Sequence, residues 1–415
     1  MPATIIRGDE CISLEDLKAH LAALLRLENV GIFLGSGASV GSGGKTVAQL
    51  WSNFLQDYQD SANSFAAEGF IHADDAVLAN FEEDPPRIAP NLETLLDALE
   101  IAKIDWERRS PTSRNLKSFK RQISNLVRSV IRAAILSKDR WLDPYHRLTS
   151  LDSHIKLLQR TIGARQPGQP SPWLFTTNYD LAVEWAAESV GIHVHTGFLG
   201  IHNRSFSPQS FDLGFQNTHA RGEARFGCND VYLAKLHGSL TWRRHADMDY
   251  RELAATEAWA ELKAVVDGKD EPDDSIMVFP RAAKYMQTVG YLSGELFRRF
   301  SDFLARPQTC LLIYGYSFGD EHLNRLIRSA LLNPTLQVVV FLPELGGDSP
   351  EDIGRQNDSV KDLLSLGSPR LTFVGGGEAV YFNRAVELLP DPILYDLTER
   401  EMRDRLRNGN EGDAE

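Results

Sequence analysis

The sequence predicts an α/β fold, a Rossmann-like parallel sheet with an inserted helical subdomain, and three observations lead to this prediction. First, the five mostly apolar residues 30–34 run directly into a glycine-rich turn, which is typical of a buried parallel strand that leads into a helix. Second, three later apolar runs also end in polar turns that contain glycine or asparagine. Third, residues at about 60–170 carry helical patterns and few strand signals.

The first predicted elements lie on either side of the glycine-rich turn. Residues 1–29 are predicted to be an N-terminal lead-in with one amphipathic helix at about 14–27, which Ser13 caps and which has Asp16 in its first turn. A further helix is predicted at about 46–58, where apolar residues recur at helical spacing. The insertion at about 60–170 is expected to hold helices at about 91–102, 115–137 and 142–161.

The sheet is predicted to resume after the insertion, within a domain that spans residues 30–395. Residues 197–230 are expected to form a long loop, and the charged stretch 243–274 is expected to hold one helix. Residues 396–415 are predicted to be a C-terminal helix and a disordered tail. The predicted strands of this part are 173–176, 191–195, 231–236, 275–279, 309–314, 337–342 and 371–374.

Composition narrows the class of protein. The 42% hydrophobic and 24% charged fractions of the 415 residues are those of an ordinary soluble protein, and the net charge of −13 argues against nucleic-acid binding by the whole surface. Cys11, Cys228 and Cys310 lie far apart without a CxxC pair, so we expect neither a structural zinc ribbon nor a disulfide framework. The acidic N-terminus has no targeting signature and no apolar run reaches membrane-spanning length, so we expect a cytoplasmic protein.

The turn Gly35–Ser39 has the features of a phosphate cradle. Gly35 and Gly37 lack the Cβ atoms that would keep a phosphate away from the backbone, and a helix that follows would aim its N-terminal amides at that phosphate. The alternative is a tight strand-to-helix turn without a ligand. A P-loop is disfavoured, because the spacing to Gly44-Lys45-Thr46 would require glycine at position 39, which is serine.

Four polar turns follow apolar strands: Gly35–Ser39, Thr176–Asp180, His237–Ser239 and Gly315–Asp320. In an open parallel sheet, ligands bind at the carboxyl ends of the strands. Four such turns from distant parts of the chain can converge only at that edge. The sequence therefore predicts one polar ligand site there, and no metal is expected in it.

The motifs in these turns, Gly-Ser-Gly-Ala-Ser, Thr-Thr-Asn-Tyr-Asp, Leu-His-Gly-Ser and Gly-Tyr-Ser-Phe-Gly-Asp, resemble in this order the motifs of sirtuin-like proteins. The resemblance is to the bacterial sirtuin-like NAD+ hydrolases of anti-phage defence in particular, and it spans roughly residues 28–345. It implies an abortive-infection effector that cleaves NAD+ to nicotinamide and ADP-ribose. The cysteine ribbon of the protein deacylases is missing, which disfavours deacylation.

The resemblance also implies roles for individual residues. Asn178 and His237 would be catalytic, with Asp180 beside Asn178 at the nicotinamide end of NAD+. Gly315 and Ser317 would contact the adenosine half. The diphosphate would be cradled by Gly35, Ser36, Gly37 and Ser39.

The chemistry of these side chains fits bond cleavage at a ribose carbon. An amide such as that of Asn178 can donate and accept at once, and so can position a water and a ribose hydroxyl. A histidine such as His237 can accept a proton near neutral pH. The structural alternative is that Asn178 and Asp180 cap the next helix, a role that can coexist with catalysis. His193 and His195 alternate along a strand without a third ligand, so a metal site there is disfavoured.

Partners are suggested by the resemblance and by one basic stretch. Relatives of this kind act as homo-oligomers, with a HerA-type ATPase, or with an Argonaute-type partner, and we expect control of one of these kinds. Residues 101–140 hold eleven Lys or Arg and three Asp or Glu. This stretch is either a solvated helix face or a docking surface for an acidic partner or nucleic acid. The basic residues that can share one helical face are Arg114, Lys117, Arg121, Arg128 and Arg132.

Two other functions remain open at this point. The basic insertion is compatible with a nuclease or nucleic-acid-binding subunit of a defence complex, although no dense carboxylate cluster accompanies it. The motif set is also compatible with a non-catalytic module that senses NAD+ or ADP-ribose.

Overall fold

The computed structural model describes residues 3–77, 90, 92–166, 168–216, 218–219, 221–222, 229–246, 249–272, 276–278, 290–343, 345 and 358–391. The predicted C-terminal helix and tail at 396–415 lie outside these residues. None of the described helices combines the length and the apolar character that crossing a membrane requires.

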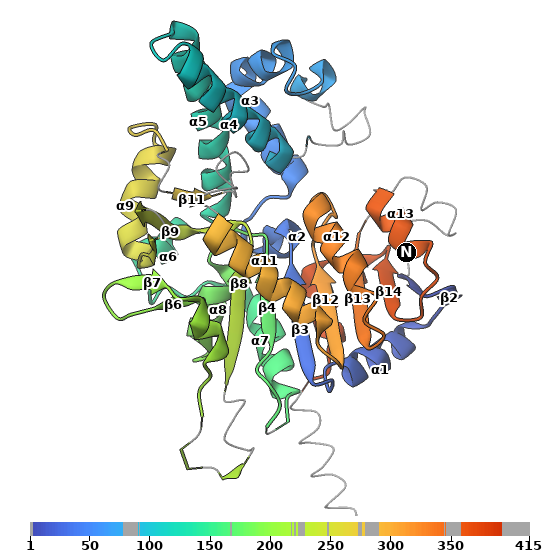
Figure 1. Ribbon diagram of the computed structural model, residues 1–415. Coiled ribbons are helices and arrows are strands. Elements are labelled where there is room, and N and C mark those ends of the chain that lie inside the picture. The colour runs from blue at the N-terminus through green and yellow to red at the C-terminus, as the bar shows by residue number, and fades with distance from the viewer. Residues whose placement is uncertain are drawn as a thin grey trace, which may run out of the picture.

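A nine-stranded sheet forms the centre of the molecule, in the order β2-β1-β14-β13-β12-β3-β4-β8-β5 (Figure 1). All strands from β14 to β5 run parallel, which confirms the predicted Rossmann-like α/β fold. The strands are β1 (Thr4–Arg7), β2 (Glu10–Cys11), β3 (Asn29–Leu34), β4 (Trp173–Thr176), β5 (His193–His195), β8 (Asp230–Lys235), β12 (Thr309–Tyr314), β13 (Leu336–Leu342) and β14 (Leu371–Gly375).

Helices cover both faces of this sheet, so its central strands are buried throughout. On β3, Ile32 and Leu34 point to one apolar core and Phe33 to the other. The first core packs under α1 (Leu14–Leu24), α7 (Asp152–Gly163), α8 (Ala182–Ser189) and α14 (Phe382–Ala385). The second packs under α11 (Gly290–Ala305), α12 (Glu321–Ala330) and α13 (Asp358–Leu364).

The N-terminal lead-in contains more than the single helix that was expected. Ser13 and Asp16 form a reciprocal capping box at the start of α1, as the capping prediction required. Before this helix, however, β1 and β2 add two antiparallel strands to the edge of the sheet. The prediction missed them because β1 is only four residues long, and its alternation is seen only in the fold, where Ile5 and Ile6 enter different cores.

The helix predicted at about 46–58 and those expected in the insertion divide between two places. The helices α3 (Val47–Ala67), α4 (Leu92–Arg109) and α5 (Arg114–Ala134) form a lobe that rises above the sheet (Figure 1). The helix predicted at 142–161 is instead α6 (Lys138–Leu142) followed by α7, because Pro144 prevents a continuous helix. Leu157 and Leu158 of α7 pack in the core against the sheet, so α7 is part of the α/β body.

A second, antiparallel sheet was not predicted. It has the order β11-β9-β10-β7-β6 and is accompanied by α9 (Ala255–Val266). Its strands are β6 (Phe198–Leu199), β7 (Arg204–Phe206), β9 (Gly238–Ala246), β10 (Asp249–Glu252) and β11 (Ile276–Val278). The predicted loop 197–230 therefore contains two short strands. The long strand β9 was missed because Arg243 interrupts its apolar pattern; this arginine is buried and bonds Glu261 at 2.6 Å.

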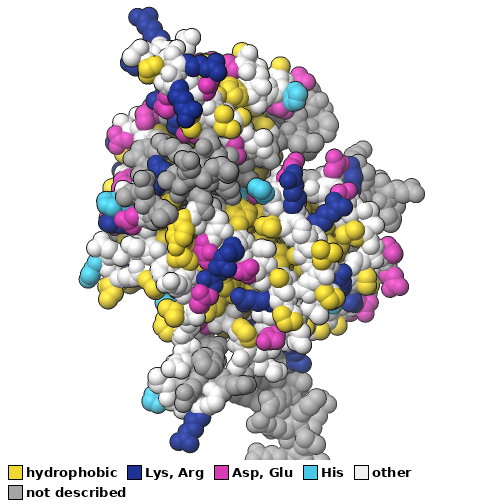
Figure 2. All heavy atoms as spheres, in the orientation of Figure 1, with side chains coloured by type: hydrophobic (Ala, Val, Ile, Leu, Met, Phe, Trp, Pro, Cys, Tyr) yellow, Lys and Arg dark blue, Asp and Glu magenta, His cyan; other side chains and the backbone are white. Residues whose placement is uncertain are grey.

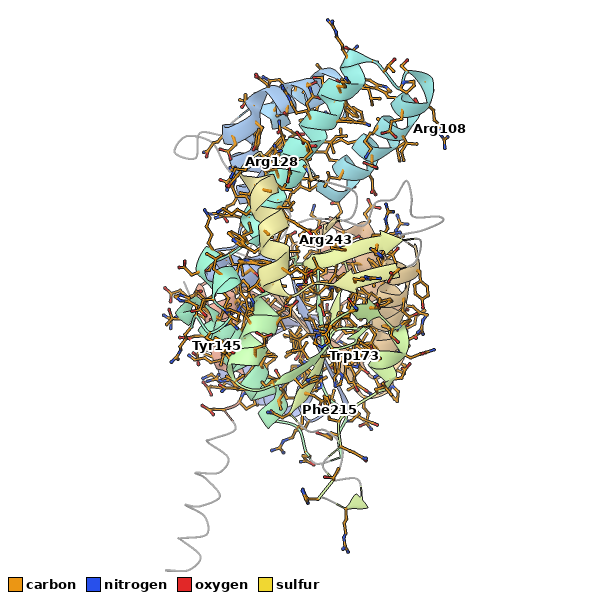
Figure 3. All side chains as sticks on the ribbon, turned by 90° about the vertical axis from the view of Figure 1, so that its left-hand side faces the viewer. Arg108, Arg128, Tyr145, Trp173, Phe215 and Arg243 are labelled. Carbon is orange, nitrogen blue, oxygen red and sulfur yellow. The ribbon has the colours of Figure 1, made fainter. Side chains whose placement is uncertain are left out.

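Two members of the predicted basic face contact the rest of the protein, and one of them is buried. Arg128 of α5 is buried, and its Nε donates to the carbonyl of Val265 at 2.7 Å. Arg132 pairs with Asp57 and donates to the carbonyl of Val266 at 3.4 Å. Both arginines thus satisfy carbonyls at the carboxyl end of α9. The prediction of one solvated face is wrong for Arg128, which is buried where the lobe meets α9 (Figure 3), whereas Arg132 stays exposed while it contacts α9.

Replacing Arg128 by alanine should lower the free energy of unfolding by about 2–4 kcal/mol, because buried carbonyls lose their donor. The measurement is urea unfolding at neutral pH. Arg121→Ala is the matched control, since Arg121 lies on the same helix, is exposed, and should change stability by less than about 0.5 kcal/mol. Equal stabilities of the two variants would contradict a role of Arg128 in attaching the lobe.

Candidate functional site

The four polar turns follow four neighbouring strands that end in register. Tyr314 of β12 pairs with Leu34 of β3, Leu34 pairs with Thr176 of β4, and Thr176 pairs with Lys235 of β8. The residues that follow these positions therefore leave the sheet side by side (Figure 1). The structure thus brings the predicted turns together at the carboxyl edge of the sheet.

The glycines of two of these turns pack against each other. A Cβ on Gly35 would lie 2.4 Å from the carbonyl oxygen of Gly315, and a Cβ on Gly37 would lie 2.7 Å from the Gly315 Cα. Gly315 itself has a φ of +62°. The Gly37 amide donates to the Gly315 carbonyl at 2.9 Å, and the Gly35 amide to Tyr314 at 2.9 Å. The structure therefore gives these glycines a packing role, and two amides of the turn already have partners within the chain.

Ser39 joins Asn178 and Asp180 in a buried hydrogen-bond network. The Ser39 hydroxyl donates to Asp180 Oδ2 at 2.7 Å and accepts from Asn178 Nδ2 at 3.0 Å. Asn178 Nδ2 also donates to the carbonyl of Gly35 at 3.0 Å. The second oxygen of Asp180 accepts the amide of Ala182 at 3.0 Å, so Asp180 caps the first turn of α8. This capping is the structural alternative considered for Asp180, and it coexists with the tie to Ser39.

This network determines how Asn178 can meet a ligand. Both N–H bonds of its amide are directed at Gly35 and Ser39, which assigns the amide orientation and leaves Oδ1 without a hydrogen bond from the described residues. Asn178 can therefore accept a hydrogen bond from a hydroxyl or a water at this edge. The hydroxyl of Ser39 is 3% exposed and engaged on both sides, so the structure gives it a positioning contact with Asn178.

A buried ion pair between Lys235 and Glu184 contacts the backbone of Asp180 and so supports the hydrogen-bond network of Ser39, Asn178 and Asp180. Lys235, at the last position of β8, donates to the carbonyl of Asp180 and to Glu184 Oε1, the latter at 2.8 Å. Burial raises the pKa of Glu184, against the opposing effect of the Lys235 charge. Sequence reasoning did not single out either residue. The sequence did contain one sign of this pair, because Lys235 stands at the end of an otherwise mostly apolar strand.

His237 pairs with Asp320 at the next strand end. The two side chains are 4% and 11% exposed, and His237 Nε2 lies 3.2 Å from Asp320 Oδ2. Burial raises the pKa of Asp320, but the hydrogen bond and charge of His237, with two backbone amides, outweigh it and lower that pKa below its ordinary value. The imidazole also stacks on Phe297 of α11. Asp320 closes the fourth motif, but it was not among the predicted site residues.

The turn predicted at His237–Ser239 is shorter than expected. Leu236 and His237 form the turn, and from Gly238 the chain enters β9. Gly238 has a φ of +105°, which lets the chain change direction there. The Leu236 amide bonds the carbonyl of Thr176 at 2.8 Å, so this turn stays attached to the Asn178 turn.

Three hydroxyl side chains complete the edge. Ser36 and Thr177 are half-buried, and Ser317 is exposed. Within the described part of the chain, no side-chain hydrogen bond engages any of them. They follow β3, β4 and β12, so they offer donors and acceptors to a ligand with hydroxyl or phosphate groups.

His154 of α7 lies close behind this network, near Asp180. It is 2% exposed, its Nδ1 has no hydrogen-bond partner among the described residues, and its ring centroid lies 4.8 Å from that of Phe382. Burial lowers the pKa of His154 to about 4, and the charge of Asp180 opposes this only in part. The histidine is therefore neutral in the folded protein at neutral pH.

Stability should fall on acidification because of His154. The unfolded chain binds a proton near pH 6.5, whereas the folded chain keeps His154 neutral down to about pH 4. Stability is thus present above pH 6.5 and is lost between pH 6.5 and 4, by up to about 3 kcal/mol. His154→Leu should flatten this dependence in urea unfolding at pH 7.5 and 5.0. Part of the slope should remain, since burial also lowers the pKa of His20 to about 4; a full wild-type slope in the variant would contradict the assignment.

The described part of the chain also contains side chains of the kinds that commonly bind metals. Among the described residues, no group of three or more His, Cys, Asp and Glu side chains could hold a metal ion. His195 bonds Asp230 at 2.8 Å, at the amino end of β8 and so at the opposite edge of the sheet. Cys310 is buried in the core, and burial raises its pKa to about 12. Cys228 lies outside the described residues.

The fold and the site together define the class: a Rossmann-like α/β protein with an amide and a carboxylate-paired histidine at adjacent strand ends. A family model described as a SIR2-like domain matches residues 172–356, which supports the sirtuin-like family. The match contains Asn178, Asp180, His237 and the turn 315–320, and it leaves out Gly35–Ser39. A SIR2-like domain suggests NAD+-related activity and is consistent with an NAD+-dependent enzyme. No curated protein that was compared with the chain matches it.

Proposed function

We propose that this protein is an NAD+ hydrolase that cleaves the nicotinamide–ribose bond to give nicotinamide and ADP-ribose. The observation that carries the proposal is the placement of Asn178 Oδ1 and the His237–Asp320 pair at adjacent strand ends. The SIR2-like match supports NAD+ as the ligand. The hydroxyls of Ser36 and Ser317, which no side-chain hydrogen bond engages among the described residues, suit its phosphate and ribose groups.

The residues present can supply what this cleavage needs. The C–N bond breaks with its electron pair moving to the nicotinamide nitrogen, which leaves as a neutral base, and positive charge develops on the ribose carbon. Water then forms the new C–O bond and gives its proton to His237. Asn178 Oδ1 is directed so that it can hold a ribose hydroxyl or this water. Asp320 stabilises the imidazolium that results.

We also propose a biological role for this activity. The motif set supports an effector of anti-phage defence that depletes NAD+ in infected cells. Such an activity is toxic when unregulated, so it requires control by homo-oligomerisation or by a partner, of which a HerA-type ATPase and an Argonaute-type protein are the candidates.

The experiment is NAD+ turnover with the products identified, for the chain alone and together with the product of its neighbouring gene. We expect equal amounts of nicotinamide and ADP-ribose, and a loss of at least about 100-fold in His237→Ala. Ligand binding without turnover, even in the complete assembly, would favour a sensor. DNA cleavage that persists in His237→Ala would favour a nuclease.

A further inference from the structure

We infer that Asp320 is a positioning residue that fixes the tautomer of His237, so that Nδ1 is the nitrogen that accepts the proton. This inference rests on the proposed function for its catalytic consequence. Its structural part, the tautomer, can be tested independently of any turnover.

The geometry assigns different tasks to the two oxygens of Asp320. Oδ1 accepts the backbone amides of His322 at 2.7 Å and Leu323 at 3.3 Å, and so caps α12. Oδ2 faces His237 Nε2 at 3.2 Å. A carboxylate with a lowered pKa is ionised at neutral pH and can only accept, so the proton of a neutral imidazole must sit on Nε2.

The helix cap makes this carboxylate a rigid partner. Asp320 cannot rotate away from His237 without leaving two amides at the start of α12 unpaired. Stacking on Phe297 restrains the imidazole from another side. The strand-end turn that carries Gly315 thus also holds the orientation of the histidine.

The substitution Asp320→Asn removes the negative charge that faces His237 but keeps a side chain that can cap α12. Asparagine caps helices as well as aspartate does, so α12 and overall stability should be retained. Its Nδ2 would donate to His237 Nε2 and move the imidazole proton to Nδ1. We expect the ¹⁵N signals of His237, assigned by their absence in His237→Gln, to exchange their protonated and unprotonated character, and NAD+ turnover to fall at least about 100-fold.

Asp16→Asn is the matched control. It also removes one carboxylate of lowered pKa from the start of a helix, but on α1, and both the tautomer of His237 and the turnover should stay as in the unaltered protein. An Nε2-protonated His237 in Asp320→Asn, or unchanged turnover, would overturn the inference. If the unaltered protein shows no turnover, the proposed function fails while the ¹⁵N measurement still decides the tautomer.

A second observation, on the helical lobe, independently carries another proposal. Where α4 ends and α5 begins, four exposed cations have no ion-pair partner within the described residues: Arg108, Arg114, Lys117 and Arg121. We call these four residues the hairpin tip. Figure 2 shows Lys and Arg side chains at this end of the molecule, and Figure 3 places Arg108 at the far end of the lobe from α9. The chain as a whole has a formal net charge of −13, so these four cations differ in sign from the protein's overall charge.

The cations of the hairpin tip lie beside a helix N-terminus, where positive charge is unfavourable. The first turn of α5 begins with Arg114 and contains no acidic residue, although a helix N-terminus favours negative charge. The nearest aromatic residues, Trp106 and Phe119, pack on each other at 4.9 Å and do not form an apolar surface patch. A protein interface needs an apolar centre, whereas a nucleic-acid interface is polar and cationic.

We propose that the hairpin tip binds the phosphate backbone of double-stranded nucleic acid without reading its sequence. Binding of a 20-base-pair DNA should be measured by fluorescence anisotropy across salt concentrations. For four phosphate contacts we expect log K to fall with log salt at a slope of about −3.6, equally for scrambled sequences. The double variant Arg114→Glu with Arg121→Glu should weaken binding at least about tenfold at 50 mM salt.

The control has the same charge change elsewhere, Arg325→Glu with Lys361→Glu on α12 and α13, and should bind as the unaltered protein does. Absence of binding at 50 mM salt, or equal loss in both double variants, would overturn the proposal. Binding of an acidic protein through the hairpin tip, without DNA binding, would overturn it in favour of a protein partner.

Discussion

Asn178→Ala should reduce NAD+ turnover at least about 100-fold, which corresponds to about 2.7 kcal/mol of lost transition-state stabilisation. The variant removes Oδ1, the one atom of the amide that its own hydrogen bonds leave for a ligand. Ser39→Ala should have a smaller effect, because it leaves the amide in place and removes only one of the two bonds that orient it. Turnover is measured by nicotinamide release at saturating NAD+.

Asn333→Ala is the control for the loss of a bridging asparagine. Asn333 Nδ2 also makes two hydrogen bonds, here to the carbonyls of Leu304 and Arg306, but at the amino end of the sheet. We expect this variant to lose stability and keep its turnover per folded molecule. Equal turnover of Asn178→Ala and Asn333→Ala would show that Asn178 acts only through structure.

Gly315→Ala should destabilise the protein by about 3 kcal/mol or more and separate the two glycine turns. The new Cβ would lie 2.4 Å from the Ala38 nitrogen and 2.7 Å from the Gly37 Cα, and both of these are backbone atoms that cannot rotate away. The φ of +62° adds strain for any residue with a Cβ. Urea unfolding measures the loss, and turnover should fall with it because the Asn178 network rests on Gly35.

Gly319→Ala tests the same turn without the clash. The nearest atom to a Cβ there is Ser317 Oγ at 3.7 Å, an ordinary contact, and Gly319 has no positive φ. Its stability should stay within about 0.5 kcal/mol of the unaltered protein. A comparable loss in both variants would mean that general stiffening of the turn, and not the contact between the glycines, is responsible.

Much of the sheet was predictable because its strands are continuous apolar runs with glycine or asparagine at their ends. The strand 173–176 was predicted with its observed bounds, and 309–314 likewise. Elements with weak local signals were missed. Short strands near the edges of the sheets, such as β1 and β6, depend on neighbours far away in sequence. Arg243 conceals β9 because its charge is neutralised only in the fold.

The sequence by itself determined that four polar turns follow buried parallel strands, and therefore that Asn178, His237 and the glycines share one edge of the sheet. Which atom each residue offers was decided only by the tertiary structure, because those assignments depend on contacts between turns more than 80 residues apart in the chain. Ser39 meets Asp180 across a separation of 141 residues, and His237 meets Asp320 across 83. The same reason explains the basic stretch: spacing placed Arg128 with its neighbours on one helix, but packing on α9 buried it and left the hairpin tip exposed.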